Sequence, residues 1–298
     1  MRAIALALVA QGAINSGFRV TVPGPRREPG KSNLRIIVVK NVALQDFGGN
    51  DIAPARARGG QVLARLHDRL GFSDKHDDFA QLGAAITSSR KIDQDQPVWA
   101  DQASRQSLYI VDEGLAYSFT FLPGGKRHID DIYGPGAICN WTRLKHEDYR
   151  CNIMAKAGTT LLALDPTRVA QWLDNRFALA NLLEQHELAR AFRNSQRIRA
   201  LISLPAPHKI AMLLLDLQEE LALAGMIGEW LPFGLTQQEI GDVAGMTVVH
   251  VNRTLAKMVD AGELERRPGK FRLLNPGRLK AQLGYLHYFG REKAYQGR

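Results

Sequence analysis

Hydrophobic and polar positions along the chain follow two different periods, and the change between them falls near residue 166. Before it, short runs rich in β-branched and aromatic residues are separated by turns that contain glycine or proline. The stretch IVDEGLAYSFTFLPGGKRHIDDI is the clearest case, because its Asp-Glu-Gly and Pro-Gly-Gly breaks are typical of hairpin turns. Regular short strands of this kind favour a small antiparallel barrel or a β-roll of the jelly-roll type. The segments QVLARLHDRLGF and DDFAQLGAAI before them predict two short helices.

After Pro166 apolar residues recur every three to four positions, a pattern that predicts helices. We expect a long helix over 176–204, ended by Pro205 and Pro207. This helix, which carries arginines at 190, 193, 197 and 199, would pack on the roll or on a twin helix. One interpretation is a coiled-coil-like dimer seam, and the other is the core helix of a monomer. The residues predicted for the seam are Leu182, Ala189 and Phe192. The segment APHKIAMLLLDLQEELALAG predicts a second apolar helix that stops at a glycine.

The segment LTQQEIGDVAGMTVVHVNRTL predicts two short helices joined by a tight turn. Thr236 and Glu239 have the spacing of a capping box, in which each side chain satisfies a backbone N–H of the other residue. Gly245 permits a sharp turn, and Thr247 can cap the helix that follows. In that helix Val251, Leu255 and Met258 form an apolar stripe for a core. This arrangement is a helix-turn-helix, whose second helix enters a DNA major groove.

The opposite face of the second helix carries the candidate base-reading residues. Arg253 can donate two parallel hydrogen bonds to guanine, and Asn252 can pair with adenine or hold a phosphate. His250 can donate to a base or a phosphate, and Val249 can pack on a thymine methyl group. Exposed Arg, Asn and His are common on helices. These residues therefore indicate DNA binding only in combination with the capping box, the glycine turn and the basic wing described next.

Phosphate contacts are expected around this helix. The segment GELERRPGKFRLL predicts two strands around a Pro-Gly turn, a wing whose cations would lie along a DNA backbone. The candidate phosphate-binding residues are Thr236, Gln237, Thr247, Lys257, Arg266, Arg267 and Lys270.

The net charge of +9 is concentrated at the two ends of the chain. Residues 1–58 carry +6 and residues 235–298 carry +5, so the middle is slightly acidic. This segregation fits a neutral sensor joined to a domain that binds a polyanion. The basic extension over 1–58 is rich in proline and glycine, with LRIIVVKNVAL as a strand candidate. We expect a disordered arm, a small added unit, or upstream sequence from a mis-assigned start.

Composition excludes several classes of protein. With only two cysteines, Cys139 and Cys151, the chain has no disulfide framework, and we expect neither an iron–sulfur cluster nor another metal site. No nucleophile motif or phosphate loop is present, so we expect a non-enzyme. The N-terminal run MRAIALALVAQGA is short for a secretory signal, and no apolar run could span a membrane. We therefore expect a cytoplasmic protein without a membrane partner.

Residues 235–283 resemble the winged helix of the Crp/Fnr family of bacterial transcription regulators, and the order of roll, long helix and winged helix extends the resemblance to about 60–283. The fold class implied is α+β, with an antiparallel β-roll effector domain before a winged helix-turn-helix. The domains expected are an extension (1–58), a cyclic-nucleotide-binding-like roll (59–175), a dimerisation helix (176–204) and a DNA-binding domain (205–298). The resemblance further implies a homodimer on a two-fold symmetric double-stranded DNA operator, with RNA polymerase as a candidate partner. Val249 departs from the acidic residue that many members carry at this position.

The resemblance places an effector pocket in the segment YGPGAICNWTRLKHEDYRCN. Its candidate residues are Gly136, Asn140, Trp141, Arg150 and Cys151. Arg150 matches the phosphate-binding arginine of the family's nucleotide binders, but Trp141 replaces their glutamate and Cys151 their hydroxyl residue. Cyclic nucleotide is therefore not the expected effector, whose identity stays open.

Other sensing chemistries, and one other function, stay open as minor alternatives. Cys139 and Cys151 could form a thiol pair that senses redox state. His128, His146 and His186 could ligate haem or a metal, although these histidines lack metal-site spacing. The alternative function is a β-roll sensor module that acts through protein contacts rather than DNA.

Overall fold

The computed structural model describes residues 22–23, 34–35, 83–98, 108–139, 152–175, 177–223 and 228–286. The chain divides into two compact units, of which the first comprises Met1–Gly48 and Trp99–Gln106. Its described part is an antiparallel pair of two-residue strands, β1 (Val22–Pro23) and β2 (Leu34–Arg35). Strand β2 covers the first two residues of the strand candidate LRIIVVKNVAL. All that follows concerns the second unit, Gly49–Val98 with Ser107–Arg298. The predicted helix QVLARLHDRLGF, and all of DDFAQLGAAI before Gly83, lie outside the described residues.

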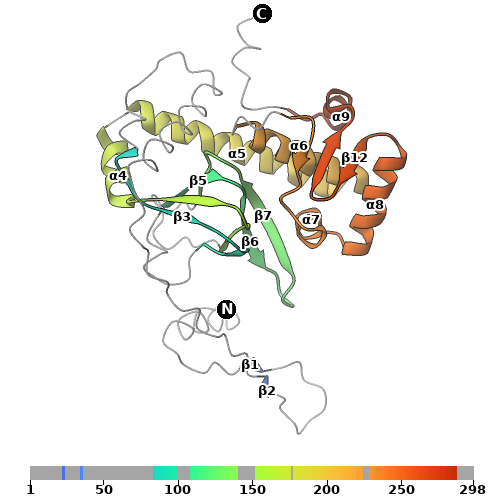
Figure 1. Cartoon of the computed structure of the whole chain (residues 1–298), viewed down its shortest axis with the longest axis horizontal. Coiled ribbons are helices and arrows are strands. Elements are labelled where there is room, and N and C mark those ends of the chain that lie inside the picture. The colour runs from blue at the N-terminus through green and yellow to red at the C-terminus, as the bar shows by residue number, and fades with distance from the viewer. Residues whose placement is uncertain are drawn as a thin grey trace, which may run out of the picture. The chain divides into compact units, whose positions relative to one another are not determined.

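Two four-stranded antiparallel sheets form the β-roll, which confirms the predicted fold class (Figure 1). Their strand orders are β3-β10-β5-β8 and β4-β9-β6-β7. Of the two predicted hairpin turns, Pro-Gly-Gly is confirmed, because β6 pairs with β7 across Gly124 and Gly125. The prediction for Asp-Glu-Gly is wrong, since Gly114 lies between β5 and β6, which belong to different sheets, so this turn carries the chain from one sheet to the other. All three glycines have positive φ. The strands are β3 (Ile86–Lys91), β4 (Gln96–Pro97), β5 (Leu108–Glu113), β6 (Ala116–Phe121), β7 (Arg127–Tyr133), β8 (Ile138–Cys139), β9 (Asn152–Ala155) and β10 (Thr160–Leu164).

Strand β3 was not predicted from the sequence. It reads ITSSRK and lies at the edge of its sheet, where only β10 pairs with it. Its middle residues are partly exposed, so the strand does not need the alternating apolar pattern that marks a half-buried strand.

Three helices follow the roll: α4 (Pro166–Asn175), α5 (Phe177–Ser203) and α6 (Ala206–Leu223). The 27 residues of α5 make a rod about 40 Å long, which runs along one side of the sheets (Figure 1). The helix ends before Pro205 as predicted, whereas Pro207 lies in the first turn of α6, where a missing N–H is tolerated.

The C-terminal part is a winged helix whose core is continuous with that of the roll. Buried side chains run in one cluster from Leu115 and Tyr117 in the roll, through α6, to Val251 and Phe271. The elements are β11 (Leu231–Pro232), α7 (Gln237–Ala244), α8 (Val248–Asp260), β12 (Leu264–Arg267), β13 (Lys270–Leu273) and α9 (Pro276–Leu283). Strand β13 lies between β11 and β12 in a small antiparallel sheet. Among the described helices, none combines the length and the apolar character needed to cross a bilayer.

Candidate DNA interface

The turn between α7 and α8 has the predicted construction. Thr236 accepts a hydrogen bond from the Glu239 N–H at 3.2 Å, and its own N–H donates to Glu239 Oε2 at 2.7 Å, which completes the capping box. Gly245 takes the left-handed conformation with φ 66°, which glycine adopts without strain. Gly241, not singled out from the sequence, is also required, because a Cβ there would lie 2.6 Å from the Met246 carbonyl oxygen. The two helices are therefore held at a fixed angle.

Helix α8 separates a buried face from an exposed one, as its sequence pattern indicates. Val251, Leu255 and Met258 are at most 1% exposed. On the opposite face Val249 is 60% exposed, and the three polar base-reading candidates, His250, Asn252 and Arg253, are exposed beside it, as is Lys257. Thr254 also belongs to the buried face, which the sequence pattern did not predict, and its hydroxyl donates to the His250 carbonyl at 2.8 Å within the helix. All four base-reading candidates therefore share one accessible surface.

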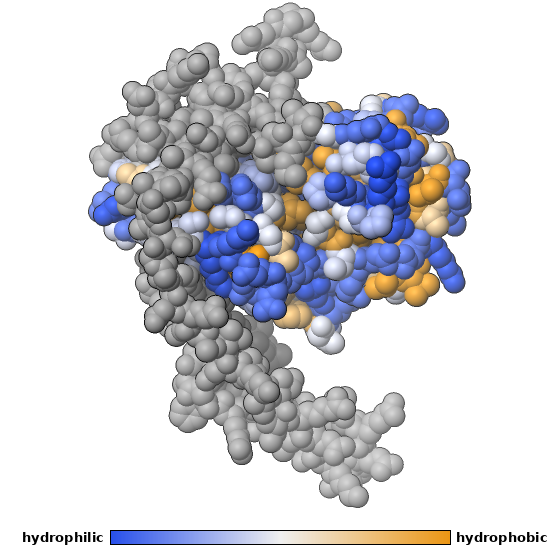
Figure 2. Space-filling model, in the orientation of Figure 1, coloured by the Kyte–Doolittle hydropathy of each residue, from blue (hydrophilic) through white to orange (hydrophobic). Residues whose placement is uncertain are grey.

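The wing places its three predicted cations on the surface. Arg266, Arg267 and Lys270 are exposed around the Pro268–Gly269 turn, where Arg267 pairs with Lys270 across the strands. The guanidinium of Arg267 lies 4.0 Å from the centre of the Trp230 ring, a cation–π contact that orients it. Trp230 carried no recognisable signal in the sequence, because it lies 37 residues before Arg267. Figure 2 shows mainly hydrophilic residues over this part of the molecule, with hydrophobic residues among them.

The remaining phosphate candidates lie at the starts of the two helices. Thr236 and Thr247 are exposed and Gln237 is half-buried. The hydroxyl groups of both threonines already act as caps, since Thr247 accepts from the His250 N–H at 3.3 Å. Thr236 also donates its hydroxyl proton to Glu239 Oε2 at 3.0 Å, so this hydroxyl is less available to a phosphate than its sequence position indicates.

The β-roll contacts helix α7 through polar side chains. Glu239 accepts from the ammonium group of Lys156 at 2.9 Å and from the Tyr117 hydroxyl at 2.8 Å. Arg127 donates from Nε to Asp242 Oδ2 at 2.8 Å and from Nη1 to the Tyr117 oxygen at 2.8 Å. Burial alone would raise the pKa of Glu239, but hydrogen bonds from the Thr236 N–H, Lys156 and Tyr117 hold it below its ordinary value. These contacts join the roll to the first helix of the helix-turn-helix.

Stability should therefore depend on pH through Glu239. A carboxyl group with a lowered pKa in the folded state stabilises the fold fully above its ordinary pKa of 4.5 and loses this contribution as pH falls through the folded-state pKa. We expect the difference in unfolding free energy between the wild type and Glu239→Gln to shrink from about pH 6 to about pH 3. Urea titrations across this range measure it. A difference that stays constant with pH would show that the Glu239 charge contributes nothing.

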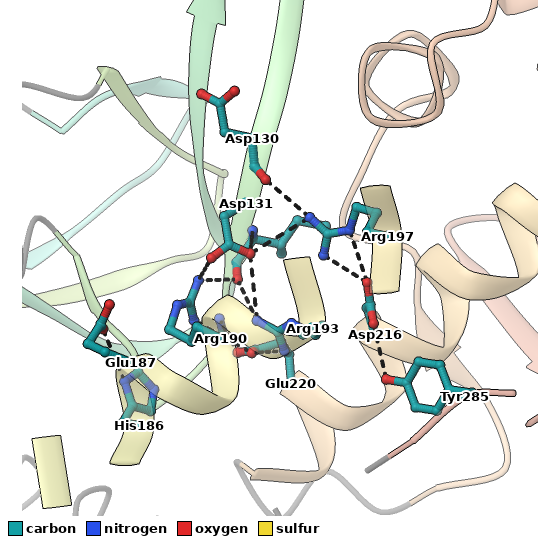
Figure 3. Close-up of polar contacts among 12 residues, drawn as sticks. Asp130, Asp131, His186, Glu187, Arg190, Arg193, Arg197, Asp216, Glu220 and Tyr285 are labelled. Carbon is teal, nitrogen blue, oxygen red and sulfur yellow. Dashed lines mark hydrogen bonds and ion pairs between the residues drawn. The ribbon is translucent and has the colours of Figure 1, made fainter. Parts of the chain in front are cut away.

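A second set of ionic contacts is buried between α5, strand β7 and α6 (Figure 3). Arg190, Arg193 and Arg197 point from one face of α5 toward Asp131 of β7, and toward Asp216 and Glu220 of α6. All six side chains are at most 9% exposed. Glu220 also accepts the Gly134 N–H at 2.7 Å. Helix α5 therefore packs on the roll through these arginines, and the roll is one of the two packing partners predicted for the helix.

The structure describes little of the predicted effector pocket. Gly136 has φ 90° and donates its N–H to the Val111 carbonyl at 2.8 Å, so it forms the expected turn. Asn140, Trp141, Arg150 and Cys151 lie outside the described residues, while Cys139 is buried in β8. His128 in β7 and His186 in α5 stand on separate elements, and His146 lies outside the described part. The described residues contain no group of His, Cys, Asp and Glu that could hold a metal ion.

The predicted dimer seam needs revision. Ala189 is 1% exposed, because it lies on the side of α5 that is turned into the chain, and it therefore cannot face a second copy. Phe192 is half-buried, and the side chain of Leu182 lies outside the described residues. The large apolar residues that α5 exposes are Leu188 at 48%, Ile198 at 57% and Ile202 at 79%. Their spacing of ten and four places them on one stripe of the helix.

Comparisons with known proteins agree with this architecture. Residues 208–282 match the model of the Crp-like helix-turn-helix domain. The chain is 22% identical over 204 residues to the nitrogen fixation regulation protein FixK of Bradyrhizobium diazoefficiens, a match that covers 68% of this chain and 84% of that protein. It is also 22% identical to the transcriptional activator protein FnrA of Stutzerimonas stutzeri, over 66% of this chain and 81% of the relative.

Solved structures share the fold. FixK2 from Bradyrhizobium japonicum superposes with a TM-score of 0.53 at 20% identity, over 65% of this chain and 94% of that one. A CRP family transcriptional regulator from Thermus thermophilus, TTHB099, gives 0.52 at 18% identity, over 67% and 98%.

Proposed function

Because the chain belongs to the Crp/Fnr family of transcription regulators, which are not enzymes, we propose that it binds a two-fold symmetric DNA operator as a homodimer. The observation that carries this proposal is the exposed face of α8. One face of the helix is fully buried in the core, and the other presents Val249, His250, Asn252 and Arg253 together. A helix held in this way by a fixed partner helix can enter a major groove with its side chains already placed. With DNA as its partner, the protein would act in the cytoplasm.

The residues divide into base contacts and phosphate contacts. Arg253 would read a guanine, Asn252 an adenine, and Val249 a thymine methyl group, with His250 donating to a base or a phosphate. Lys257 and the wing residues Arg266, Arg267 and Lys270 would neutralise phosphates on either side of the groove. Val249 has no carboxylate to accept a hydrogen bond from cytosine, so the preferred half-site should differ from that of members with an acidic residue here.

The dimer is proposed to form along α5 through Leu188, Ile198 and Ile202. These residues form the exposed stripe described above, on the side of the helix opposite the buried arginines. Two copies joined along such a helix would place their recognition helices about 34 Å apart, one turn of B-DNA. The domain limits 59–175, 176–204 and 205–298 stay a prediction within this arrangement.

Replacing Ile198 by glutamate should make the protein monomeric. A carboxylate at the centre of an apolar helix–helix seam would be desolvated without a partner, which costs several kcal/mol, about enough to dissociate a micromolar dimer. Light scattering on the purified chain measures the mass. The matched control is Leu274→Glu, because Leu274 is also an exposed apolar residue, at 41%, but lies after the wing. A dimer that persists in Ile198→Glu would place the interface elsewhere.

The proposed function is tested by selection from random duplex DNA, with and without cyclic AMP. A palindromic motif recovered equally in both arms supports a DNA-reading dimer that does not need the nucleotide. A motif found only with cyclic AMP would support DNA reading but contradict the inference from Trp141 and Cys151. Without a motif in either arm, salt dependence of DNA binding between about 50 and about 200 mM decides, because a protein that neutralises phosphates shows a steep slope. A flat slope would favour the sensor module that acts through protein contacts.

A further inference from the structure

The contacts between the β-roll and helix α7 are more than packing. Glu239 has two roles, since one carboxylate completes the capping box of α7 and also accepts hydrogen bonds from Lys156 and Tyr117 of the roll. One turn further along the same helix, Asp242 accepts from Arg127. Two points on one face of a short helix are thus fixed from outside the winged helix, which leaves α7 little freedom to rotate.

We propose that Lys156, Tyr117 and Arg127 are positioning residues for DNA recognition, which fix α7 from the roll and so set the angle at which α8 meets DNA. This inference rests on the proposed function and extends it to residues that never touch DNA. Because Gly241 and Gly245 hold α8 at a fixed angle to α7, a restraint on α7 is passed directly to α8.

Each of the three roll residues is itself held in place. Lys156 follows strand β9 and also binds Asp95, whose other carboxylate oxygen accepts the Ala157 N–H at 2.8 Å. Tyr117 in β6 and Arg127 in β7 belong to one hairpin and are hydrogen-bonded to each other. The restraint therefore comes from the folded sheet and not from loose surface chains.

Burial indicates why these groups serve orientation and not DNA contact. The side chain of Lys156 is 11% exposed and that of Glu239 is 6% exposed, so this ammonium group is enclosed and already paired. A buried ion pair adds little net stability compared with apolar residues, but its partners must meet in one geometry. The reading face of α8 stays open in the arrangement that these contacts fix, with Val249 60% exposed. The fixed orientation is thus one in which DNA can reach α8.

The test measures the affinity of the full chain for its selected operator and for unrelated duplex DNA, each across a range of salt concentrations. Lys156→Met should lower operator affinity roughly tenfold and leave the salt slope unchanged. Lys156→Arg, which keeps the cation, should restore most of the affinity. Thr120→Ala is the control, because Thr120 lies on the hairpin of Tyr117 and Arg127 and its hydroxyl donates to Asp130 at 2.7 Å on the exposed side. It should leave operator affinity unchanged.

A double-mutant cycle identifies the partner. Glutamine also serves in a capping box, so Glu239→Gln keeps the start of α7 while removing the charge that faces Lys156. If Lys156 acts through Glu239, the double variant should lose little more operator affinity than either single variant. If the losses of operator affinity in the two single variants added fully in the double variant, Lys156 would not act through Glu239.

Three further outcomes would contradict the proposal. A salt slope that falls by about one in Lys156→Met would make this residue a phosphate contact. Operator affinity that rises in Lys156→Met would make the roll contacts a restraint against DNA binding, and unchanged affinity would show that Lys156 has no role in it.

Hydrogen exchange of α7 amides without DNA should be faster in Lys156→Met than in the wild type. Should the wild type neither select a DNA motif nor bind DNA with a steep salt slope while exchange still responds, the proposed function fails and the restraint on α7 stands as a purely structural contact.

Discussion

Replacing Arg193 by alanine is expected to lower the free energy of unfolding by about 3–5 kcal/mol, because it leaves Glu220 buried without its main partner. Arg193 contacts Glu220 directly, and these side chains are 4% and 2% exposed. Arg193 also lies 3.7 Å from Asp131 of the roll, so the substitution affects carboxylates on two elements at once. Glu220 would keep Arg190, at 3.6 Å, and the Gly134 N–H, but a buried carboxylate that loses its nearest cation is strongly destabilising.

The carboxylates depend on the arginines for their charge. Burial would raise the pKa of Asp131, but Arg190, Arg193 and Arg197 together hold it below its ordinary value. Burial acts on Glu220 in the same way, and Arg193 and Arg190 lower its pKa. Without Arg193 both groups should take up protons at higher pH, so the loss of stability should be larger at neutral pH than in acid.

Urea denaturation followed by circular dichroism measures this loss. The matched control is Arg168→Ala, since Arg168 pairs with Asp165 across one turn and is 57% exposed. Its surface ion pair should contribute within about 1 kcal/mol. An Arg193→Ala variant as stable as Arg168→Ala would show that the α5 arginines are not paired inside the protein as described.

The sequence predicts the helix-turn-helix closely because every signal there is local. The capping box spans four residues, and the turn glycine and the core stripe of α8 lie within the next nineteen. Glu239 shows the limit of prediction from local sequence signals. Its capping role follows from Thr236 three residues away, whereas its bonds to Lys156 and Tyr117 join residues 83 and 122 positions apart. Contacts at such separations leave no periodic signal in a single sequence.

Helix α5 shows a different limit. Its sequence pattern predicts a contact face of apolar residues, but its buried side carries Arg190, Arg193 and Arg197, paired with acids from β7 and α6. Ile198 and Ile202 are left on the outside. Since one residue turns a helix by 100°, the choice between Ala189 and Leu188 decides which face is the seam, and that choice depends on partners the pattern does not reveal.

Replacing Arg253 by alanine should weaken binding to the operator by about 1–3 kcal/mol for each half-site. A homodimer would lose this binding free energy in both half-sites. The reason is geometric: a guanidinium can donate two parallel hydrogen bonds to guanine O6 and N7, and no other base offers both acceptors in the major groove. Arg253 is exposed on α8, one turn after Val249 and on the same face. The variant should also accept any base at one position of each half-site, as a repeated selection from random DNA would show.

The matched substitution is Lys270→Ala in the wing, which removes a positive charge from the same domain without touching a base. Lys270 is exposed at the first residue of β13, beside the Pro268–Gly269 turn. It should weaken binding to all sequences about equally and reduce the salt slope by about one for each phosphate that is no longer neutralised. Arg253→Ala, by contrast, should change the preferred sequence with little change in slope. If Arg253→Ala weakened every sequence alike, Arg253 would be a phosphate contact, and the reading of bases would have to rest on Asn252, His250 and Val249.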